Sequence, residues 1–508
     1  MDATAIQARF DKAKALRNIL EPTFDDAFRL TMPLRPRFSE ANPRTTDDIF
    51  DETGANAVSE FVSRMSAGLT PSFTPFVKLQ CSSLVAPNDR KAINEDLKDI
   101  QDYIFEEIWA SNFAQEQSEC LYDLAVSTST MLVEEGTAGN LLQHRSIPMT
   151  ETYLEGGPNG GIGGRFRCSK VKAKDLPTRY KYARFSAATM DDIKKQGDKE
   201  LEALEYTRQD FTASQPVFHH VVMIVEHKDI CVQRKLKGLG SNPFITSRWT
   251  TSPGQVWGRG PLIGALAAVR TTNLMVEMVL ENAAMAIIGM YQTDNDGIVN
   301  ADNVTLLPGT IIAKDPQSSG LEQIKGHGGQ FNMQDVVLND QRINIKRALF
   351  NDMLSDPNKT PATAYEVSER MADLAHRTSA GFSRYFYEGI TPYIRRVLYL
   401  AEKKGDIKLP VQNGRAIDFM ATSPLAQAQA GRDIQRLMQD FQIRTAMWGP
   451  AAASGMYKLE EIMPWLEEKM ALDPKLYKSA KDIIEVLRQQ TENLQQQMQQ
   501  QPQPQQQP

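Results

Sequence analysis

The chain has 508 residues, of which 41% are hydrophobic and 24% are charged, and its formal net charge is -6. This length exceeds what one hydrophobic core usually supports, so we expect two or more sub-domains, and the composition argues against a largely disordered chain. A mildly acidic protein is a poor candidate for wrapping nucleic acid tightly, because Lys and Arg supply that affinity by neutralising phosphates. The same charge is compatible with a protein that forms a passage through which DNA slides without binding tightly.

The four cysteines are dispersed along the chain. Cys81, Cys120, Cys168 and Cys231 contain no CxxC pair, so we expect neither a zinc site nor a disulfide framework, and a reducing interior is the natural compartment. Residues 3–20 mix charged side chains into an amphipathic pattern, which is not that of a signal peptide.

The first third of the chain has the apolar spacing of amphipathic helices. Helices are predicted over 3–20, with a break near Pro22, over 56–69 and over 92–109. Their apolar stripes are expected to form core.

From about Met131 the pattern changes to short extended runs and glycines, including the glycine-rich loop at 156–164. This change predicts a β-rich sub-domain. Its later strands are expected at 218–225 and 230–235, after an acidic helix over 190–205.

The most apolar stretch follows this sub-domain. Residues 261–288 are predicted to form one helix, roughly 40 Å long at 1.5 Å per residue, with Pro261 in its first turn. Apolar residues surround most of the helix, which must therefore be covered by its own domain or by neighbouring copies. Arg270, Glu277 and Glu281 argue against a membrane span.

Beyond this helix the chain makes an excursion over 289–330 and returns as a helix over 333–354. Turn residues and two strand-like runs mark the excursion. The returning helix ends in a loop at 355–361, because Pro357 and Pro361 forbid a continuous helix.

Another long helix is predicted directly after this loop. Gly389 and Pro392 predict a kink in it before it ends near Gly405. The C-terminal part is expected to be helical again. The glutamine-rich tract from Gln489 lacks the apolar residues needed to fold alone, so we expect it to be disordered or loosely helical.

No catalytic motif emerges from the sequence. Gly258, Gly260 and Gly264 form GxGxxxG, one residue longer than the dinucleotide fingerprint and without a βαβ unit, so we expect them to let the chain turn into the long helix. A Walker A loop, HExxH and GxSxG are missing from the sequence. His219 and His227 are too far apart along a strand to bind one ion. We therefore expect no enzyme activity, cofactor or metal.

Seven short passages, spread in order over most of the chain, are characteristic of a known family when taken together. They are IFDETG (49–54), LTP (69–71), VEEGTAG (133–139), PFITSRW (243–249), GQVWGRGP (254–261), TAYEV (363–367) and SPLAQA (423–428). By these passages the chain resembles the portal, or head-to-tail connector, proteins of short-tailed bacteriophages. It departs from that family after the first long helix, where a proline pair is common and this chain has Ile288, Gly289 and Met290.

The resemblance implies an α+β, mainly helical portal fold that assembles as a ring, typically of twelve subunits, at one capsid vertex. The implied regions are a wing (1–250), a first stem helix (251–288), a clip (289–332), a second stem helix (333–354), a tunnel loop (355–361), a kinked helix joining wing to crown (362–405), a C-terminal helical crown (406–488) and a Gln-rich tail (489–508).

The resemblance also implies which residues serve the channel. The tunnel loop that narrows the channel is Asp356, Pro357, Asn358, Lys359 and Thr360, with Lys359 the first candidate for a weak phosphate contact. Channel-facing candidates on the second stem helix are Arg342, Lys346 and Arg347, and clip residues for partner docking are Asp294, Asp296, Lys314 and Asp315. The alternative for each charged residue is a solvated or inter-subunit charge pair.

The implied partners are further copies of the chain, double-stranded DNA in the channel, the terminase large subunit, tail adaptor and tail proteins, scaffold and capsid proteins, and internal core or ejection proteins, with no membrane. The location would be the virion, after assembly in the host cytoplasm. The alternatives are another virion ring or internal core protein, or a DNA-processing packaging enzyme.

Overall fold

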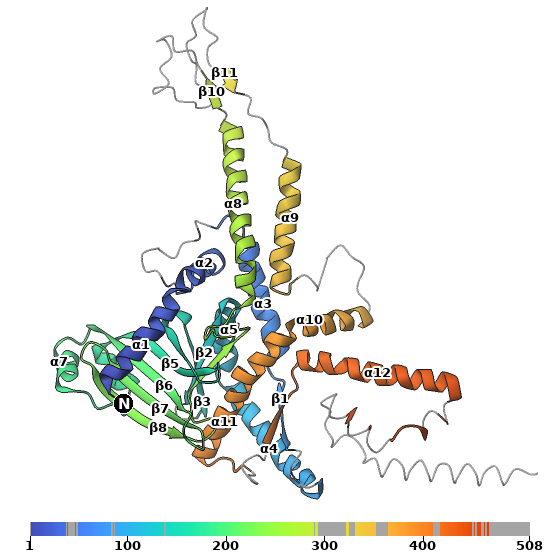
Figure 1. Ribbon diagram of the computed structural model, residues 1–508, viewed down its shortest axis with the longest axis horizontal. Helices are drawn as coiled ribbons and strands as arrows, with labels where there is room; N and C mark the ends of the chain where they lie inside the picture. The colour runs from blue at the N-terminus through green and yellow to red at the C-terminus, as the bar shows by residue number, and fades with distance from the viewer. Residues whose placement is uncertain are drawn as a thin grey trace, which may run out of the picture.

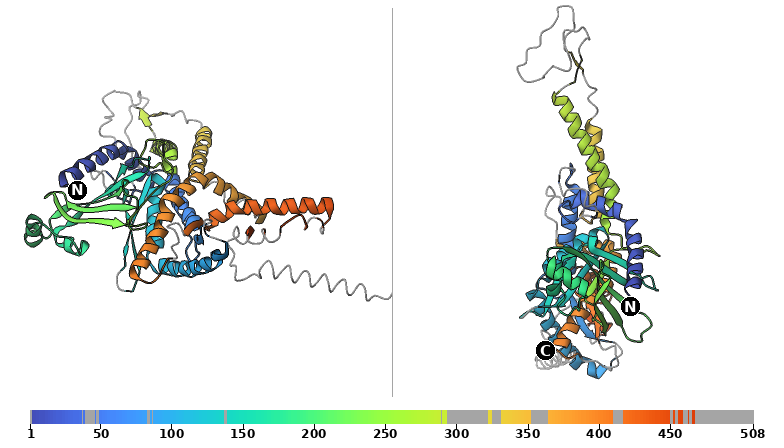
Figure 2. Two further views of the ribbon diagram at one scale, coloured as in Figure 1. Left: turned by 60° about the horizontal axis from the view of Figure 1, so that its bottom comes forward. Right: turned by 90° about the vertical axis from the view of Figure 1, so that its left-hand side faces the viewer.

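A broad body of sheets and helices carries a pair of long helices that projects from it (Figures 1 and 2). The computed structural model describes residues 2–36, 38, 46, 49–82, 85, 87–136, 139–288, 290–292, 322–324, 331–351, 364–409, 417–449, 452, 455–458, 462, 465 and 466. Over these residues the fold is α+β, with antiparallel sheets and helices that cover them.

Helices occupy the N-terminal region, as the apolar spacing predicted. They are α1 (Ala3–Asn18), α2 (Glu21–Thr31), α3 (Thr53–Leu69), α4 (Pro87–Ala110) and α5 (Phe113–Val126). The predicted break is confirmed, because Pro22 lies in the first turn of α2. On α3, Val58, Phe61, Met65 and Leu69 recur every three or four positions and are all buried.

A five-stranded antiparallel sheet forms one side of the body. It consists of β4 (Thr152–Gly156), β5 (Ile162–Lys172), β6 (Glu200–Asp210), β7 (Val217–Ile224) and β8 (Asp229–Lys237), in that spatial order. Helix α1 packs on one face through Ile6 and Phe10. On the other face lie η2 (Ala173–Asp175), α6 (Leu176–Arg179) and α7 (Ala187–Lys195). Both faces are covered, which explains the apolar character of these strands.

The acidic helix predicted over 190–205 is wrong in its second half. Helix α7 ends at Lys195, and β6 begins at Glu200. Leu201 and Ala203 pack on the face that α6 and α7 cover, whereas Leu204 packs on the face that α1 covers. Side chains alternate between faces in a strand, and here both faces are buried, so the acidic residues between them hid the pattern.

A three-stranded antiparallel sheet lies near the centre of the body. Its order is β3 (Leu142–Ile147), β2 (Thr128–Glu135) and β9 (Phe244–Arg248), and the short η1 (Met149–Glu151) follows β3. The largest hydrophobic core joins this sheet to α3, α4 and α5 and to the helices that follow the α9–α10 connection.

The long helix predicted over 362–405 has the kink that Gly389 and Pro392 indicated. It consists of α10 (Ala364–Tyr385), a π-helical turn η4 (Phe386–Ile390) and α11 (Thr391–Lys404). The N–H of Thr391 donates to the carbonyl of Phe386, five residues earlier, as in a π turn. The helix ends at Gly405 as predicted.

The projecting pair consists of α8 (Pro261–Ile288) and the antiparallel α9 (Phe331–Ala348). Both predicted bounds of α8 are confirmed. Beyond it, β10 (Met290–Gln292) pairs with β11 (Glu322–Ile324). The strand-like runs predicted within the excursion lie outside the described residues.

Two C-terminal elements complete the described chain. Strand β12 (Ile417–Ala421) pairs with β1 (Val77–Cys81), and α12 (Pro424–Trp448) points away from the body (Figure 1). The region predicted as a helical crown therefore contains a strand near its start. Its end and the glutamine-rich tail lie outside the described residues.

Candidate functional site

The base of the projecting pair is where segments distant in sequence converge, and its first component is the segment that leads into α8. The N–H of Gly260 donates to the carbonyl of Val126 at 2.9 Å, and the N–H of Gly258 donates to Thr128 Oγ1 at 3.0 Å. A Cβ on Gly258 would lie 2.6 Å from the carbonyl oxygen of Ser127, and one on Gly260 would overlap the end of α5. Gly258 and Gly260 therefore allow close backbone packing at the entry to α8, where the sequence predicted a tight turn.

A second component is the segment before α3, which is held by both projecting helices. Asn273 Oδ1 on α8 accepts from the N–H groups of Phe50 at 2.8 Å and Asp51 at 3.1 Å. The Nε and Nη2 atoms of Arg342 on α9 donate to Asp51 Oδ2 at 2.9 and 2.7 Å. One short segment thereby fixes α8 and α9 to the start of α3.

Asp51 is buried, and its ionised form is well supplied with donors. Burial opposes ionisation, but hydrogen bonds from Thr53 and Arg342 outweigh it and lower the pKa of Asp51. The carboxylate is therefore charged at neutral pH and pairs with the guanidinium. An exposed pair between Arg270 on α8 and Asp26 on α2 adds a third connection at the base.

A third component joins the kinked helix to the same base. Arg248, at the end of β9, is 3% exposed, and its Nε and Nη2 atoms donate to the two carboxylate oxygens of Glu388 at 2.9 and 2.6 Å. Its Nη1 atom donates to the carbonyl of Val256 at 3.0 Å, on the segment that leads into α8. Arg384 also donates to Glu388. One buried arginine thus connects the π turn to the start of the projecting pair.

The outer part of the pair carries exposed apolar side chains. Leu274, Met278 and Leu280 on α8 are 50%, 52% and 53% exposed, and Val337 and Ile343 on α9 are 41% and 44% exposed. Residues four apart share a helix face, whereas Leu280 lies six residues from Leu274, about 240° around the helix. The pair therefore presents apolar surface on more than one side.

By length and composition alone, Pro261–Ala283 is apolar enough to cross a membrane, with a mean hydropathy of 1.4. A third of this stretch is buried against the rest of the chain. It also contains Arg270 and Glu277, and ionised side chains are costly in hydrocarbon. Burial against other protein surfaces also removes the apolar side chains of this stretch from water.

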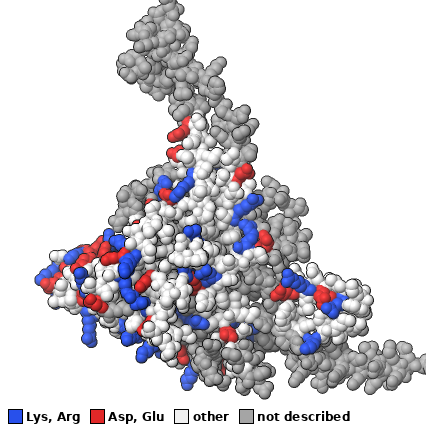
Figure 3. Space-filling model, viewed as in Figure 1, with Lys and Arg blue, Asp and Glu red and all other residues white. Residues whose placement is uncertain are grey.

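Charged side chains are distributed unevenly along the pair. Lys and Arg gather near the base, whereas acidic side chains lie farther out (Figure 3). Of the predicted channel residues, Arg342 pairs with Asp51, and Lys346 and Arg347 are exposed in the last turn of α9. Cations are favourable at a helix C-terminus, which gives these two residues a local structural role as well.

The other predicted site residues lie outside the described part of the chain. These are the tunnel-loop residues Asp356, Pro357, Asn358, Lys359 and Thr360, and the clip residues Asp294, Asp296, Lys314 and Asp315.

The end of α9 differs from the helix predicted to run to 354. The N–H of Phe350 donates to the carbonyl of Arg347 at 3.1 Å, and the N–H of Asn351 donates to that of Lys346 at 2.7 Å. These two bonds define a Schellman motif. In this motif the position that Phe350 occupies has a left-handed backbone, and the residue there is usually glycine. The φ angle of Phe350 is positive, at 61°, which lies outside the helical range. No glycine marks this stop in the sequence.

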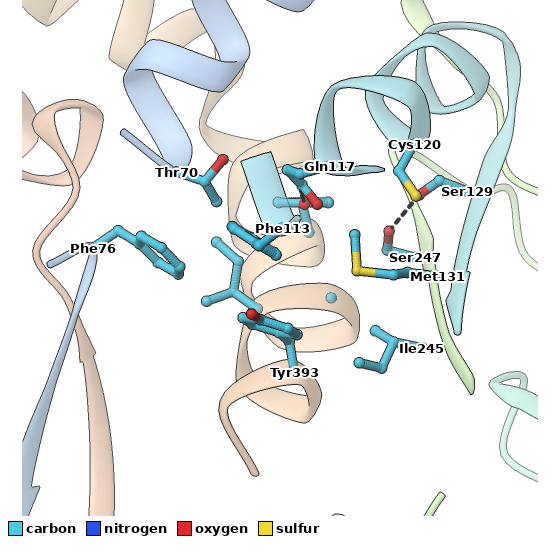
Figure 4. A pocket seen from close by; sticks show the side chains of 13 residues that line it. Thr70, Phe76, Phe113, Gln117, Cys120, Ser129, Met131, Ile245, Ser247 and Tyr393 are labelled. Atoms are coloured by element: carbon cyan, nitrogen blue, oxygen red, sulfur yellow. Dashed lines mark hydrogen bonds between the residues drawn. The ribbon is translucent and has the colours of Figure 1, made fainter. Parts of the chain in front are cut away.

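A small cavity lies between the π turn and the body (Figure 4). Its volume is about 20 Å³, which is room for one water molecule and far less than a small-molecule substrate needs. Ser129 Oγ and Ser247 Oγ lie 2.8 Å apart at its edge. The hydroxyl of Thr70, which also lines the cavity, has no hydrogen-bond partner among the described residues.

Within the described ranges, no three His, Cys, Asp or Glu side chains are grouped to hold a metal ion. His219 Nε2 lies 3.5 Å from Asp210 Oδ2, and His227 Nε2 lies 2.7 Å from Asp192 Oδ2, so the two histidines have separate partners. Burial raises the pKa of the Cys120 thiol to about 12, which keeps it protonated and unreactive.

Two solved structures are similar to the chain: one from the virion of a native gene transfer agent particle (11% identity, TM-score 0.36) and one from the neck of an empty gene transfer agent particle (10% identity, TM-score 0.34). Each match covers 84% of this chain and 91% of the other. These TM-scores are too low to assign a role from the two structures. No curated protein matches the chain. The family described as bacteriophage head to tail connecting protein matches residues 3–477, nearly the whole length, so the chain belongs to this family.

Proposed function

We propose that the chain is a portal subunit, which assembles with further copies into a ring at one capsid vertex, and that DNA enters and leaves the capsid through this ring. The observation that carries the proposal is the exposed apolar surface on more than one side of α8 and α9, in a chain of the connector family. Such surface is unfavourable in water and is stabilised where a neighbouring subunit covers it.

The placement of this surface favours a ring over a closed dimer. A two-fold dimer uses one patch that meets itself, whereas different patches on two sides of a subunit meet head to tail and close into a ring. Leu274 and Leu280 lie on different sides of α8, and Val337 and Ile343 are likewise six residues apart on α9. Twelve copies are expected from the family.

In this arrangement α8 and α9 form the stem around the channel. The excursion beyond them is the clip that docks the packaging motor and later the tail adaptor, and the connection between α9 and α10 carries the tunnel loop. Lys346 is a better candidate for DNA contact than Arg342, because Lys346 is exposed whereas Arg342 pairs with Asp51. An acidic chain with a few basic positions would let DNA move through the ring with weak contacts. The subunit itself would perform no catalysis.

Electron microscopy of the purified full-length chain tests this proposal. We expect rings of one size, with the α8–α9 pairs lining or surrounding a central channel. A stable monomer at concentrations where the chain is soluble would contradict the proposal. Locating the rings within assembled particles would then distinguish a portal, which is set in the capsid shell at one vertex, from another virion ring or an internal core protein.

A further inference from the structure

A basic surface lies at one edge of the five-stranded sheet. Strand β8 comes last in the spatial order and pairs with β7 on one side. Arg234, Lys235 and Lys237 on β8 are exposed, and none of them has an ion-pair partner among the described residues. In Figure 3, blue side chains line the lower-left edge of the body, where Figure 1 places β8. Cations that are not neutralised within the chain attract an anionic surface.

The segment before α7 extends this basic surface. The N–H of Arg184 donates to the carbonyl of Cys231 on β8 at 2.9 Å, so the segment lies beside the strand. Tyr182 is 76% exposed, and the guanidinium carbon of Arg234 lies 4.8 Å from the centroid of its ring. This cation–π contact holds the Arg234 side chain in place. We call the five exposed cations the basic edge: Lys181, Arg184, Arg234, Lys235 and Lys237.

Charged side chains also protect many edge strands from pairing with other chains. That role needs charge on the strand itself. It does not explain the exposed cations Lys181 and Arg184, which lie on the neighbouring segment, or the contact that holds Arg234 on Tyr182. A surface that binds an anionic partner explains all of these features.

Helix α4 of the same chain carries the opposite charge on its outer face. Its exposed carboxylates recur at intervals of four, three and four residues, so they share one side of the helix. None of them has an ion-pair partner among the described residues. Carboxylates four residues apart on a helix repel each other, and cations that approach them relieve this repulsion. We call these residues the acidic stripe: Glu95, Asp99, Asp102 and Glu106.

The acidic stripe and the basic edge are similar in length and in height on the molecule. Glu95 and Glu106 are separated by about 16 Å along the helix. Arg234 and Lys237 are separated by about 10 Å along β8, and the segment before α7 lengthens the basic edge. Both α4 and β8 lie in the half of the body away from the projecting pair (Figure 1). Copies arranged around an axis parallel to the pair therefore bring the two surfaces to the same height.

We propose that the acidic stripe of one copy binds the basic edge of a second copy. This inference rests on the proposed function, because it names surfaces by which neighbouring subunits recognise each other. Two different patches meet in this contact, so it is head to tail, which is the kind of contact that closes into a ring.

The pairing sets the orientation and the rate of assembly more than its strength. Exposed ion pairs each add little affinity, whereas burial of apolar surface such as that of α8 adds more. Opposite charges steer together two copies that each have a net charge of -6 and otherwise repel. Assembly should therefore slow about tenfold when salt is raised from about 0.05 M to about 0.5 M.

Charge reversal in the full-length chain tests the pairing. The stripe variant combines Glu95→Lys, Asp99→Lys, Asp102→Lys and Glu106→Lys. The edge variant combines Lys181→Glu, Arg184→Glu, Lys235→Glu and Lys237→Glu, and it keeps Arg234 on Tyr182. Each variant alone should form rings about tenfold more slowly than the unmodified chain, because like charges then meet. Light scattering measures the rate, and electron microscopy identifies the rings.

Restoration of opposite charge should restore assembly. An equimolar mixture of the two variants, or one chain with all eight substitutions, should form rings at nearly the unmodified rate. Thermal unfolding checks that each variant is folded, since exposed substitutions should change stability little. A matched control makes the same change in net charge at exposed carboxylates outside α4, and it should assemble no more slowly than the unmodified chain. It combines Asp11→Lys, Asp175→Lys, Asp191→Lys and Asp198→Lys.

Normal assembly of both variants would overturn the pairing, as would a folded eight-substitution chain that does not recover. An edge variant that assembled normally but bound a short DNA duplex more weakly would also overturn it, because the basic edge would then serve DNA. In each case rings of the unmodified chain would still support the portal function. If the unmodified chain formed no rings, the portal function would fail. Sedimentation of the mixed variants, compared with each alone, would then decide whether the two surfaces bind.

Discussion

In the body, helices such as α3 and α11 bury their apolar faces within the chain, whereas the outer half of α8 leaves Leu274, Met278 and Leu280 about half exposed. The body therefore draws its stability from its own contacts. The outer part of the pair gains little from the subunit that carries it and has most to gain from neighbours. Between the two regions, Asp51, Asn273 and Arg342 fix the direction in which the pair leaves the body.

The largest effect is expected where the body meets the pair. Trp249 is 4% exposed and packs edge-on against Phe61 at 5.6 Å. Trp249→Ala should lower the free energy of unfolding by about 3–5 kcal/mol, because it leaves a cavity among several elements. Denaturant titration measures this loss. Leu280→Ala, on the exposed pair, is the control and should change the isolated subunit by less than about 0.5 kcal/mol. Equal losses would erase the contrast between the two regions.

A pH-dependent effect is expected inside the body. Asp123 is buried, and this burial outweighs the attraction of Arg35 and raises the pKa of Asp123 to about 6. Between about pH 4 and pH 6 the folded chain retains a proton that the unfolded chain has lost, so the free energy of unfolding falls as pH rises, by about 2–3 kcal/mol. Thermal unfolding across this range should show the fall, and Asp123→Asn should remove it. Glu119→Gln alters the more exposed carboxylate that pairs with Arg35 and should leave this fall in the free energy of unfolding unchanged.

The connection between the regions should show the opposite dependence on pH. The lowered pKa of Asp51 means that its pairing with Arg342 stabilises the fold above the usual carboxyl range and is lost as pH falls through and below that range. At pH 7, Asp51→Asn should cost about 1.5–3 kcal/mol, because a buried charged hydrogen bond is weakened. Asp26→Asn removes the exposed pair with Arg270 and should cost less than about 1 kcal/mol. Similar costs would mean that burial of Asp51 contributes nothing extra.

On the outer pair, a substitution should affect association and not folding. Met278→Lys should leave the unfolding of the isolated subunit within about 0.5 kcal/mol of normal. It should weaken ring formation by about tenfold or more, because a charge would replace an apolar contact. Sedimentation analysis measures this change. The same substitution at Met190, on α7 of the body, is the matched control. Unchanged assembly of Met278→Lys would show that this face is not an interface.

The smallest effect on the subunit is expected at Lys359. Lys359→Ala should alter neither its stability nor ring assembly, while DNA packaging or retention changes, because only a weak phosphate contact would be lost. Particle DNA content, with ring formation checked by microscopy, provides the measurement. If the variant failed to form rings, the tunnel loop would be an assembly element and our assignment would be wrong.

The sequence predicted those parts of the fold that depend on local pattern. Both bounds of α8 follow from Pro261 at its start and a mainly apolar stretch that continues to Ile288, and the kink near Gly389 follows from local helix chemistry. The end of α9 and the start of β6 were predicted wrongly. Tertiary packing decides the first, and burial of both strand faces conceals the second.

The contacts at the base were not predicted. Asp51 and Arg342 are 291 residues apart in the sequence. Arg248 and Glu388 are 140 residues apart. No spacing rule connects such pairs. The only signal was indirect, since the passages IFDETG and PFITSRW, which carried the resemblance to the family, contain Asp51 and Arg248. Lys346 and Arg347 were recognised by charge alone, which cannot tell a channel contact from a helix-end cation.

The pairing of β1 with β12 has a consequence for synthesis of the chain. The two strands are roughly 340 residues apart, so at about 5–20 residues per second β1 waits some 20–70 s for its partner to leave the ribosome. During that interval the edge of β1 is open to pairing with other chains. A truncated product that ends before Ile417 would keep this edge open permanently while still carrying the apolar faces of α8. Such fragments should aggregate. Synthesis of β12 is therefore the step after which a subunit can assemble with other copies without an open β1 edge.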